Sequence, residues 1–191
     1  QICSSIGCPR IRPPMNGMLG MTELLLSTEL NQRQRRLAQT ARQSGTALLK
    51  IINDILDFSK IEAGKLELER FDFDLRGTMD EVVGLFVESA QAKRAAMILQ
   101  VDAAVPSTLR GDAGRLRQIL TNLIANAIKF TDRGEIIVRV RLAGDGGDHV
   151  VLRFEVRDTG IGIELDAQAR IFDAFSQADS SSTRRHGGTG L

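Results

Sequence analysis

A heptad repeat in the first third of the chain constrains its fold most strongly. Between Asn31 and Gly64, apolar or small side chains recur at alternating spacings of four and three residues: Leu37, Ala41, Ser44, Leu48, Ile51, Ile55 and Phe58. This repeat predicts one long helix that packs in a helical bundle or coiled coil rather than on a sheet. Asn31 offers N-cap chemistry at its start, and Gly64 is expected to end it.

A shorter amphipathic helix is predicted just upstream, over residues 15–26, with a turn at Ser27 and Thr28. The two helices would form a hairpin. Because two helices alone bury little apolar surface, a homodimer that forms a four-helix bundle is the economical arrangement. Packing of the hairpin against the rest of its own chain is the alternative.

From Lys65 onward the pattern changes to short alternating and helical segments. Alternation at Leu66, Leu68, Phe71 and Phe73 is typical of short strands. Further elements are expected as helices over 75–93 and 110–130, a strand over 97–101, and a β-hairpin from 135–142 and 149–156. Helices with an antiparallel or mixed sheet predict a two-layer α+β domain. Residues 173–190, poor in large apolar side chains, are predicted to be a mobile loop.

Composition excludes several function classes. A net charge of +1 with no Trp and no Tyr gives no footprint for nucleic-acid binding. No apolar run reaches the roughly 18–20 residues of a membrane span, and no signal-peptide pattern is present. We therefore expect a soluble, cytoplasmic segment. Cys3 and Cys8 are expected to be free thiols because their spacing suits neither a zinc site nor a redox motif.

Three polar residues on the second predicted long helix point to a ligand. Asn122, Asn126 and Lys129 are spaced i, i+4 and i+7, so they fall within roughly 60° of one another around the helix. They lie apart from the apolar stripe of the same helix, which consists of Leu116, Ile119, Leu120, Leu123, Ile124 and Ala127. Amide oxygens are hard ligands suited to Mg²⁺, and a lysine supplies a point charge for phosphate. Such a polar face, taken alone, is more often simply solvated.

Two glycine motifs follow this helix in the sequence. Asp158-Thr-Gly-Ile-Gly162 comes directly after an extended apolar run, and Gly187-Gly-Thr-Gly190 lies near the end of the chain. Each motif alone is more typical of a turn than of a ligand site. Their order and spacing behind the amide-bearing helix favour a shared site.

Together these segments resemble the sensor histidine kinases, most closely the hybrid type. The family's motifs occur in order: Asp57-Phe-Ser-Lys-Ile-Glu-Ala-Gly64 in the hairpin, the N box at 112–131, the G1 box at 158–162, the F box at 172–179 and the start of the G2 box at 184–191. The resemblance implies an atypical segment at 1–11, a dimerisation and histidine phosphotransfer hairpin at 12–66, and a Bergerat-type ATP-binding domain at 67–191 that is incomplete at its C-terminal end.

The resemblance also implies roles for individual residues. Asn126 would bind the Mg²⁺ that bridges the phosphates of ATP, Asn122 would support that site, and Lys129 would contact phosphate oxygens. Asp158 would accept a hydrogen bond from the amino group of adenine. The other ATP-binding positions would be Gly160, Gly162, Phe175, Arg184, Gly187, Gly188, Thr189, Gly190 and Leu191.

The chain departs from the family at the phosphoacceptor. Pro9 stands where the histidine is expected, Arg10 replaces its acidic neighbour, and Pro13 replaces a threonine. Proline has no nucleophilic nitrogen, so no catalytic residue is retained at this position. Prolines also resist helix interiors, by about 3 kcal/mol or more, so three of them predict that the first helix does not run through this region. The two histidines, His149 and His186, are expected to be surface residues.

Three functional hypotheses follow. The first is the catalytic core of a membrane-linked two-component sensor that phosphorylates histidine and passes the phosphoryl group to a receiver domain. The second is a dimerising pseudokinase that binds nucleotide without transferring phosphate. The third, a chaperone or topoisomerase ATPase, is disfavoured because those proteins usually place a glutamate where Asn122 stands. For this chain we predict Mg-ATP binding without autophosphorylation at the usual position.

Overall fold

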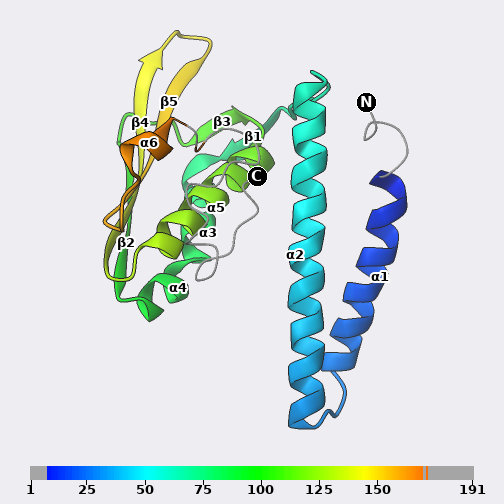
Figure 1. The fold of residues 1–191 in the computed structure, drawn as a ribbon. Helices are drawn as coiled ribbons and strands as arrows, with labels where there is room; N and C mark the ends of the chain where they lie inside the picture. The colour runs from blue at the N-terminus through cyan, green and yellow to red at the C-terminus, as the bar shows by residue number, and fades with distance from the viewer. Residues whose placement is uncertain (1–7, 170, 172–191) are drawn as a thin grey trace. The chain divides into compact units, whose positions relative to one another are not determined.

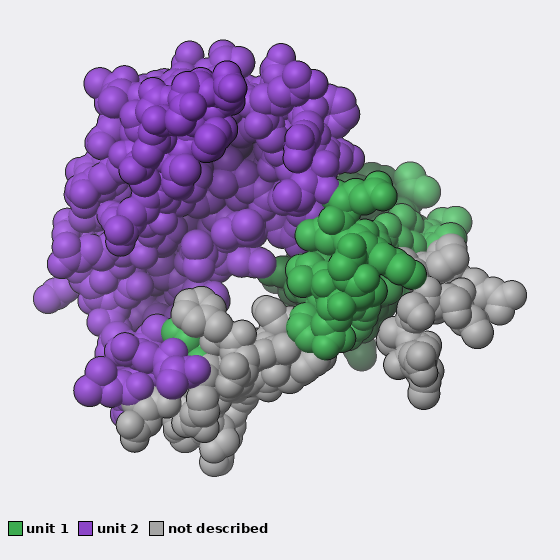
Figure 2. Space-filling model, turned by 90° about the horizontal axis from the view of Figure 1, so that it is seen from above, with its two compact units in different colours: residues 1–67, 170–191 green, residues 68–169 purple. Residues whose placement is uncertain are grey.

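The computed structural model describes residues 8–169 and residue 171. Two compact units divide this part of the chain, one over residues 8–67 and one over residues 68–169 (Figure 2). The first unit contains α1 (Cys8–Leu26) and α2 (Gln32–Glu62). The second contains β1 (Phe71–Asp74), α3 (Leu75–Gly84), α4 (Val87–Ala92), β2 (Ala95–Val101), β3 (Thr108–Gly111), α5 (Ala113–Phe130), β4 (Gly134–Asp145), β5 (Val150–Asp158) and α6 (Leu165–Gln168). Of the helices described, none is long and apolar enough to cross a bilayer.

The ends of α2 are fixed as the sequence predicts. Asn31 forms a capping box with Gln34: the Asn31 side chain accepts from the Gln34 amide at 2.9 Å, and the Gln34 side chain accepts from the Asn31 amide at 3.1 Å. At the other end Gly64 adopts a left-handed φ of 62°. The amides of Gly64 and Lys65 then return to the last turn, to the carbonyls of Ile61 and Lys60, which is a Schellman motif.

The hairpin of α1 and α2 closes where α2 carries small side chains. Ala38 and Gly45 are the buried residues of α2. A Cβ built on Gly45 would lie 2.9 Å from Met18 Cε and 3.0 Å from Leu19 Cδ2, so a larger side chain there would require these two side chains of α1 to shift. Leu37 and Leu48, from the predicted bundle seam, remain 62% and 46% exposed. Part of the apolar repeat is therefore left uncovered within the single hairpin.

The prediction that prolines exclude a helix at the start of the chain is wrong. Helix α1 begins at Cys8 and contains Pro13 and Pro14 in its second turn. Pro9 falls in the first turn, where a backbone N–H has no acceptor within the helix, so its missing donor costs little. Two donors are lost at the later prolines, and tertiary contacts compensate: Arg12 Nε donates to Asn53 Oδ1 of α2 at 3.0 Å. Packing here overrides local propensity.

The second unit is the two-layer α+β domain expected from the sequence. Strand β2 pairs parallel with β4, and β4 pairs antiparallel with β5, which gives a mixed sheet of order β2-β4-β5. A separate antiparallel pair joins β1 to β3. Helices α3, α4 and α5 lie on one face of the mixed sheet (Figure 1). The core between the layers is made by Leu75, Met79, Val82, Leu120, Ile124, Ala127, Ile136, Val138 and Val140.

Among the element boundaries that differ from the sequence expectations, three concern the segments around α3 and α5. The predicted helix over 75–93 is split into α3 and α4, because Gly84 weakens the helix and Leu85 has no core to enter, being 73% exposed. Of the alternating run before it, only Phe71–Asp74 forms a strand. The amide-bearing helix starts at Ala113 rather than at 110, because the Asp112 side chain caps it by accepting from the Arg115 amide at 2.8 Å.

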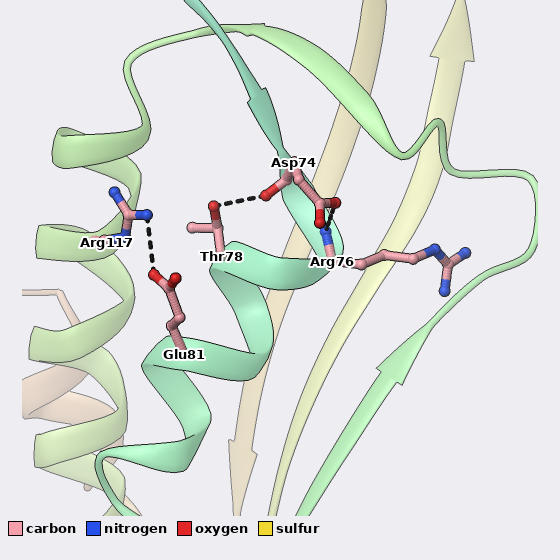
Figure 3. A network of polar contacts seen from close by, with 5 residues as sticks. All are labelled: Asp74, Arg76, Thr78, Glu81 and Arg117. Atoms are coloured by element: carbon pink, nitrogen blue, oxygen red, sulfur yellow. Dashed lines mark hydrogen bonds and ion pairs between the residues drawn. The ribbon is translucent and has the colours of Figure 1, made fainter.

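Polar contacts fasten α3 to its neighbours (Figure 3). Asp74 caps α3 by accepting from the Arg76 amide at 3.0 Å, and Thr78 Oγ1 donates to the Asp74 carbonyl at 2.7 Å. Glu81 of α3 and Arg117 of α5 form an ion pair at 3.0 Å between Oε2 and Nη2. The first two contacts fix the start of α3, and the third adds a largely exposed link between α3 and α5, whose spacing is set by the apolar core.

Two buried threonines allow a matched test of this packing. Thr131 is fully buried, and its Oγ1 has no hydrogen-bond partner among the described residues. Thr131→Val is therefore expected to raise the free energy of unfolding by about 1 kcal/mol, since an unsatisfied hydroxyl is replaced by an isosteric methyl. Thr78→Val, which removes a satisfied hydroxyl, should lower it by about 1 kcal/mol. Urea denaturation measures both, and a destabilised Thr131→Val variant would contradict the assignment.

Candidate functional site

Helix α5 separates its packing face from its polar face. Leu120 and Ile124 are fully buried against the sheet and α3. On the polar face Asn126 is exposed, while Asn122 and Lys129 are half-buried. The Lys129 ammonium lies 4.8 Å from the centroid of the Phe130 ring. Burial of one side of α5 thus holds the two amides and the lysine on the other.

The end of β5 turns sharply at Asp158. Asp158 Oδ1 accepts from the Gly160 amide at 2.9 Å, which closes a local turn. The turn is fastened to β4, because the Thr159 amide donates to the Glu135 carbonyl at 3.2 Å and the Glu135 amide donates to Thr159 Oγ1 at 3.0 Å. Asp158 itself is exposed, and its Oδ2 makes no hydrogen bond with any described residue. One carboxylate oxygen therefore shapes the turn, on a side chain that is exposed.

The turn and the end of α5 touch directly. The Ile161 amide donates to the Phe130 carbonyl at 3.3 Å. A Cβ at Gly160 would fall onto that same carbonyl oxygen, so glycine is required for the backbones to approach. Lys129 and the turn after Asp158 are thereby brought together, with Asn126 and Asn122 one and two helical turns back along α5.

Gly162 has a different reason to be glycine. Its φ of 72° lies in the left-handed region, and a Cβ built there would have nothing within 4 Å. The backbone conformation, rather than a neighbouring protein atom, selects glycine at this position. The space beside it is open to solvent.

The remaining predicted positions lie outside the described residues. These are Phe175, Arg184, Gly187, Gly188, Thr189, Gly190 and Leu191. His186 falls there as well, as does the predicted loop over 173–190. His149 is exposed in the turn before β5, as expected.

Electrostatics fix the start of α5. The Asp112 carboxylate accepts from the Arg115 amide at 2.8 Å and from the Glu69 amide at 3.1 Å. These hydrogen bonds, first that of Arg115, lower the pKa of Asp112 below its usual value because they favour the charged form. The cap therefore stays ionised at neutral pH and is lost only as the pH falls through that lowered pKa.

The chemistry of the polar face suits Mg²⁺ held together with phosphates. No group of three or more His, Cys, Asp or Glu side chains capable of holding a metal occurs in the described part of the chain. Asn126 offers an exposed amide oxygen, and Mg²⁺ usually takes one or two protein ligands, with phosphate oxygens and waters completing its octahedron. The donors present thus fit a nucleotide-bound ion better than a cage made only of protein.

One residue at this site was missed by the sequence reasoning. Lys93 follows α4, and its Nζ donates to the carbonyls of Ile128 at 2.8 Å and Lys129 at 2.9 Å. It also lies 3.6 Å from Asp132 Oδ1. Ile128 and Lys129 lie 35 and 36 residues from Lys93 in the sequence, and no motif around Lys93 predicts these hydrogen bonds.

Comparison with known proteins assigns both units. Residues 10–64 match the family model "His Kinase A (phospho-acceptor) domain", and residues 111–191 match "Histidine kinase-, DNA gyrase B-, and HSP90-like ATPase". The chain is 50% identical over 181 residues to the signal transduction histidine-protein kinase BarA of Escherichia coli K12, a match that covers 95% of this chain and 20% of BarA. The chain belongs to the sensor histidine kinases.

Solved histidine kinases share its fold. The structure of full-length ShkA in complex with AMPPNP matches with a TM-score of 0.75 and 39% identity over 96% of this chain and 37% of ShkA. Histidine kinase ThkA in complex with response regulator protein TrrA matches with a TM-score of 0.55 at 20% identity, over 88% of this chain and 49% of that one, which shows the fold alone. The chain spans about a fifth of the length of BarA. The match to both domains of a sensor histidine kinase disfavours the chaperone or topoisomerase hypothesis.

The contact at Gly160 predicts a strong sensitivity to one methyl group. Gly160→Ala is expected to lower the free energy of unfolding by about 1–3 kcal/mol, because the backbone of Phe130 cannot yield as a flexible side chain would. Gly84→Ala, at a helical glycine with nothing within 4 Å of its Cβ position, is the matched control and should be neutral or stabilising. Thermal unfolding of both variants checks this, and equal midpoints would contradict the close approach.

Proposed function

We propose that this histidine kinase core binds Mg-ATP between the polar face of α5 and the turn after β5. The observation that carries the proposal is the contact between the two motifs at the Phe130 carbonyl, where the Ile161 amide hydrogen bonds at 3.3 Å. It supports a site in which groups suited to phosphate and to the base belong to one rigid piece of backbone. The ShkA structure solved with AMPPNP, an ATP analogue, is consistent with nucleotide binding in this fold.

The residues of α5 handle the phosphates in this proposal. Asn126, exposed on the helix, contributes an amide oxygen to Mg²⁺, and Asn122 supports it from one turn back. Lys129 brings an ammonium to the phosphate oxygens. When bound, Mg²⁺ neutralises phosphate charge. The protein positions the nucleotide and neutralises phosphate charge, and these two effects account for most of the catalysis of phosphoryl transfer.

Asp158 selects the base. Its Oδ1 accepts from the Gly160 amide at 2.9 Å, and in this proposal Oδ2 serves as the acceptor for the base. An adenine presents an amino group to that oxygen, whereas a guanine presents a carbonyl in the same place and is repelled. Once the bound base excludes water, the guanine carbonyl and the Asp158 carboxylate would face each other as two acceptors, which costs free energy and favours ATP over GTP. Gly160 and Gly162 let the backbone approach the base and sugar.

The second half of the site is proposed from the family pattern. Phe175 and Arg184 would contribute to ATP binding, and the segment Gly187 to Leu191 would fold over the phosphates as a lid. Backbone N–H groups of the glycines would face the phosphate oxygens.

This chain does not phosphorylate itself at the usual position. Pro9 occupies the place of the acceptor histidine, and its ring nitrogen is a tertiary amide that cannot attack phosphorus. Helix α1 nevertheless continues through Pro9 and reaches Cys8. The family reaction, transfer of the γ-phosphoryl group of ATP to histidine and onward to a receiver aspartate, therefore lacks its first acceptor here.

The hairpin pairs with a second copy in a four-helix bundle. Support comes from apolar side chains left uncovered in the single hairpin: Met21, Leu24, Leu37 and Leu48 are 70%, 64%, 62% and 46% exposed. Burial of such side chains drives association. A response-regulator receiver domain is the proposed downstream partner, as in the ThkA complex with TrrA. The parent protein is proposed to be a membrane-linked sensor that holds this part in the cytoplasm.

A dimerising pseudokinase is the second candidate, favoured by Pro9 alone. It shares nucleotide binding and dimerisation with the first candidate and differs in transferring no phosphate to any acceptor. Phosphate incorporation into a Pro9→His variant separates the two, because only a competent kinase core would phosphorylate a restored histidine.

Labelled ATP tests the proposal directly. The chain is expected to bind the fluorescent analogue TNP-ATP in the presence of Mg²⁺ and to incorporate no acid-labile phosphate from ATP labelled at the γ-position. Asn126→Ala should weaken binding by roughly tenfold or more, since loss of a metal ligand costs at least as much as loss of a residue that supports one. Gln91→Ala, which removes an exposed amide elsewhere in the same unit, is the control and should bind normally.

Two results would contradict the proposal. Equal affinity of the Asn126→Ala variant and the parent chain would exclude Asn126 from the site. Acid-labile phosphate on the chain would show that another residue serves as acceptor and would refute the role assigned to Pro9.

A further inference from the structure

The ammonium of Lys93 sits at the C-terminal end of α5. Its Nζ donates to the Ile128 carbonyl at 2.8 Å and to the Lys129 carbonyl at 2.9 Å, and lies 3.6 Å from Asp132 Oδ1. The Lys93 side chain is 33% exposed. The ammonium thus makes two hydrogen bonds and one ion pair, and the side chain crosses from the end of α4 to the end of α5.

These contacts complete the hydrogen bonding of the helix terminus. The last four carbonyls of an α-helix have no partner within the helix unless the chain beyond supplies one. In α5 the Ala127 carbonyl accepts from the Thr131 amide at 3.0 Å, and the Phe130 carbonyl accepts from the Ile161 amide at 3.3 Å. Lys93 serves the two carbonyls in between. Its positive charge also opposes the negative end of the helix dipole.

We infer that Lys93 is a positioning residue for the nucleotide site, an inference that rests on the function proposed above. It acts through the backbone of Lys129 and the adjoining Phe130 and does not touch the ligand. Lys93 holds the backbone carbonyl of Lys129, the residue whose side chain is proposed to contact phosphate. The next carbonyl, that of Phe130, accepts from the Ile161 amide in the turn that follows Asp158. Lys93 therefore fixes the position of Lys129, which faces the phosphates in the proposed site, relative to Asp158, which faces the base.

A second contact to α5 provides the contrast. Arg117 of α5 pairs with Glu81 of α3 at 3.0 Å, and their side chains are 44% and 68% exposed. This pair also joins α5 to a neighbouring helix, but it lies in the first half of α5, away from the turn after β5. If Lys93 only stabilised the fold, loss of either contact should affect nucleotide binding to the same extent.

Three variants of the full chain separate positioning from stability. Lys93→Met removes the donors, Lys93→Arg keeps charge and donors, and Arg117→Met breaks the contrasting pair. Two readouts apply to each: the dissociation constant for TNP-ATP with Mg²⁺, and the amide NMR signals of Gly160 and Ile161 without nucleotide. Where Lys93→Met does not fold, Lys93→Gln, which keeps a neutral donor, is read in the same way.

The expected pattern is specific. Lys93→Met should weaken TNP-ATP binding by about tenfold, as is typical when a residue behind a ligand group is lost, and should shift both amide signals. Lys93→Arg should restore affinity, and Arg117→Met should change neither readout. Unmoved Gly160 and Ile161 signals in Lys93→Met, or an equal loss of affinity in Arg117→Met, would overturn the inference. If the parent chain fails to bind TNP-ATP, the proposed function falls, and the amide signals alone decide whether Lys93 holds the turn.

Discussion

The packing of α5 on the mixed sheet is the constraint on which the candidate site depends. Leu120, Ile124 and Ala127 are buried against Ile136 and Val138 of β4, which fixes the rotation of the helix about its axis. Once that rotation is set, the polar residues of α5 have only one direction to face. The end of the helix is then joined to the turn after β5 through the Phe130 carbonyl, so the same core that stabilises the domain also aligns the two motifs.

The sequence predicted those parts of the fold in which local chemistry and periodicity agree. The long α2 with its Asn31 cap and Gly64 stop, the β4–β5 hairpin and the polar face of α5 all follow from spacing and cap residues. Prediction from the sequence failed where tertiary contacts, rather than local propensity, determine the structure. Prolines in α1 are tolerated because the helix packs on α2, and Ile119 and Leu123 of the expected apolar stripe stay 57% and 43% exposed because the stripe is wider than the buried face. The sequence did not predict the contacts of Lys93, because its partners are backbone carbonyls that are distant in sequence.

The contrast between the two units bears on function. In the first, helix α1 runs through Pro9 within a hairpin that matches the phospho-acceptor domain, and we propose that Pro9 replaces the nucleophile without disturbing the helix. In the second, helix α5 and the turn after β5 carry Asn122, Asn126, Lys129 and Asp158, the described residues that are proposed to handle ATP. The chain thus belongs to the sensor histidine kinases, and we propose that it binds ATP but has no acceptor histidine at the usual position.

Discrimination between purine nucleotides tests the central claim most directly. In the proposed site, Asp158 accepts a hydrogen bond from the amino group of adenine, and the residues of α5 would hold Mg²⁺ and the phosphates. Calorimetric titration of the chain with ATP and with GTP, each with Mg²⁺, should show binding of ATP and a loss of affinity for GTP of at least about tenfold. Equal affinity for the two nucleotides, or binding of neither, would contradict it.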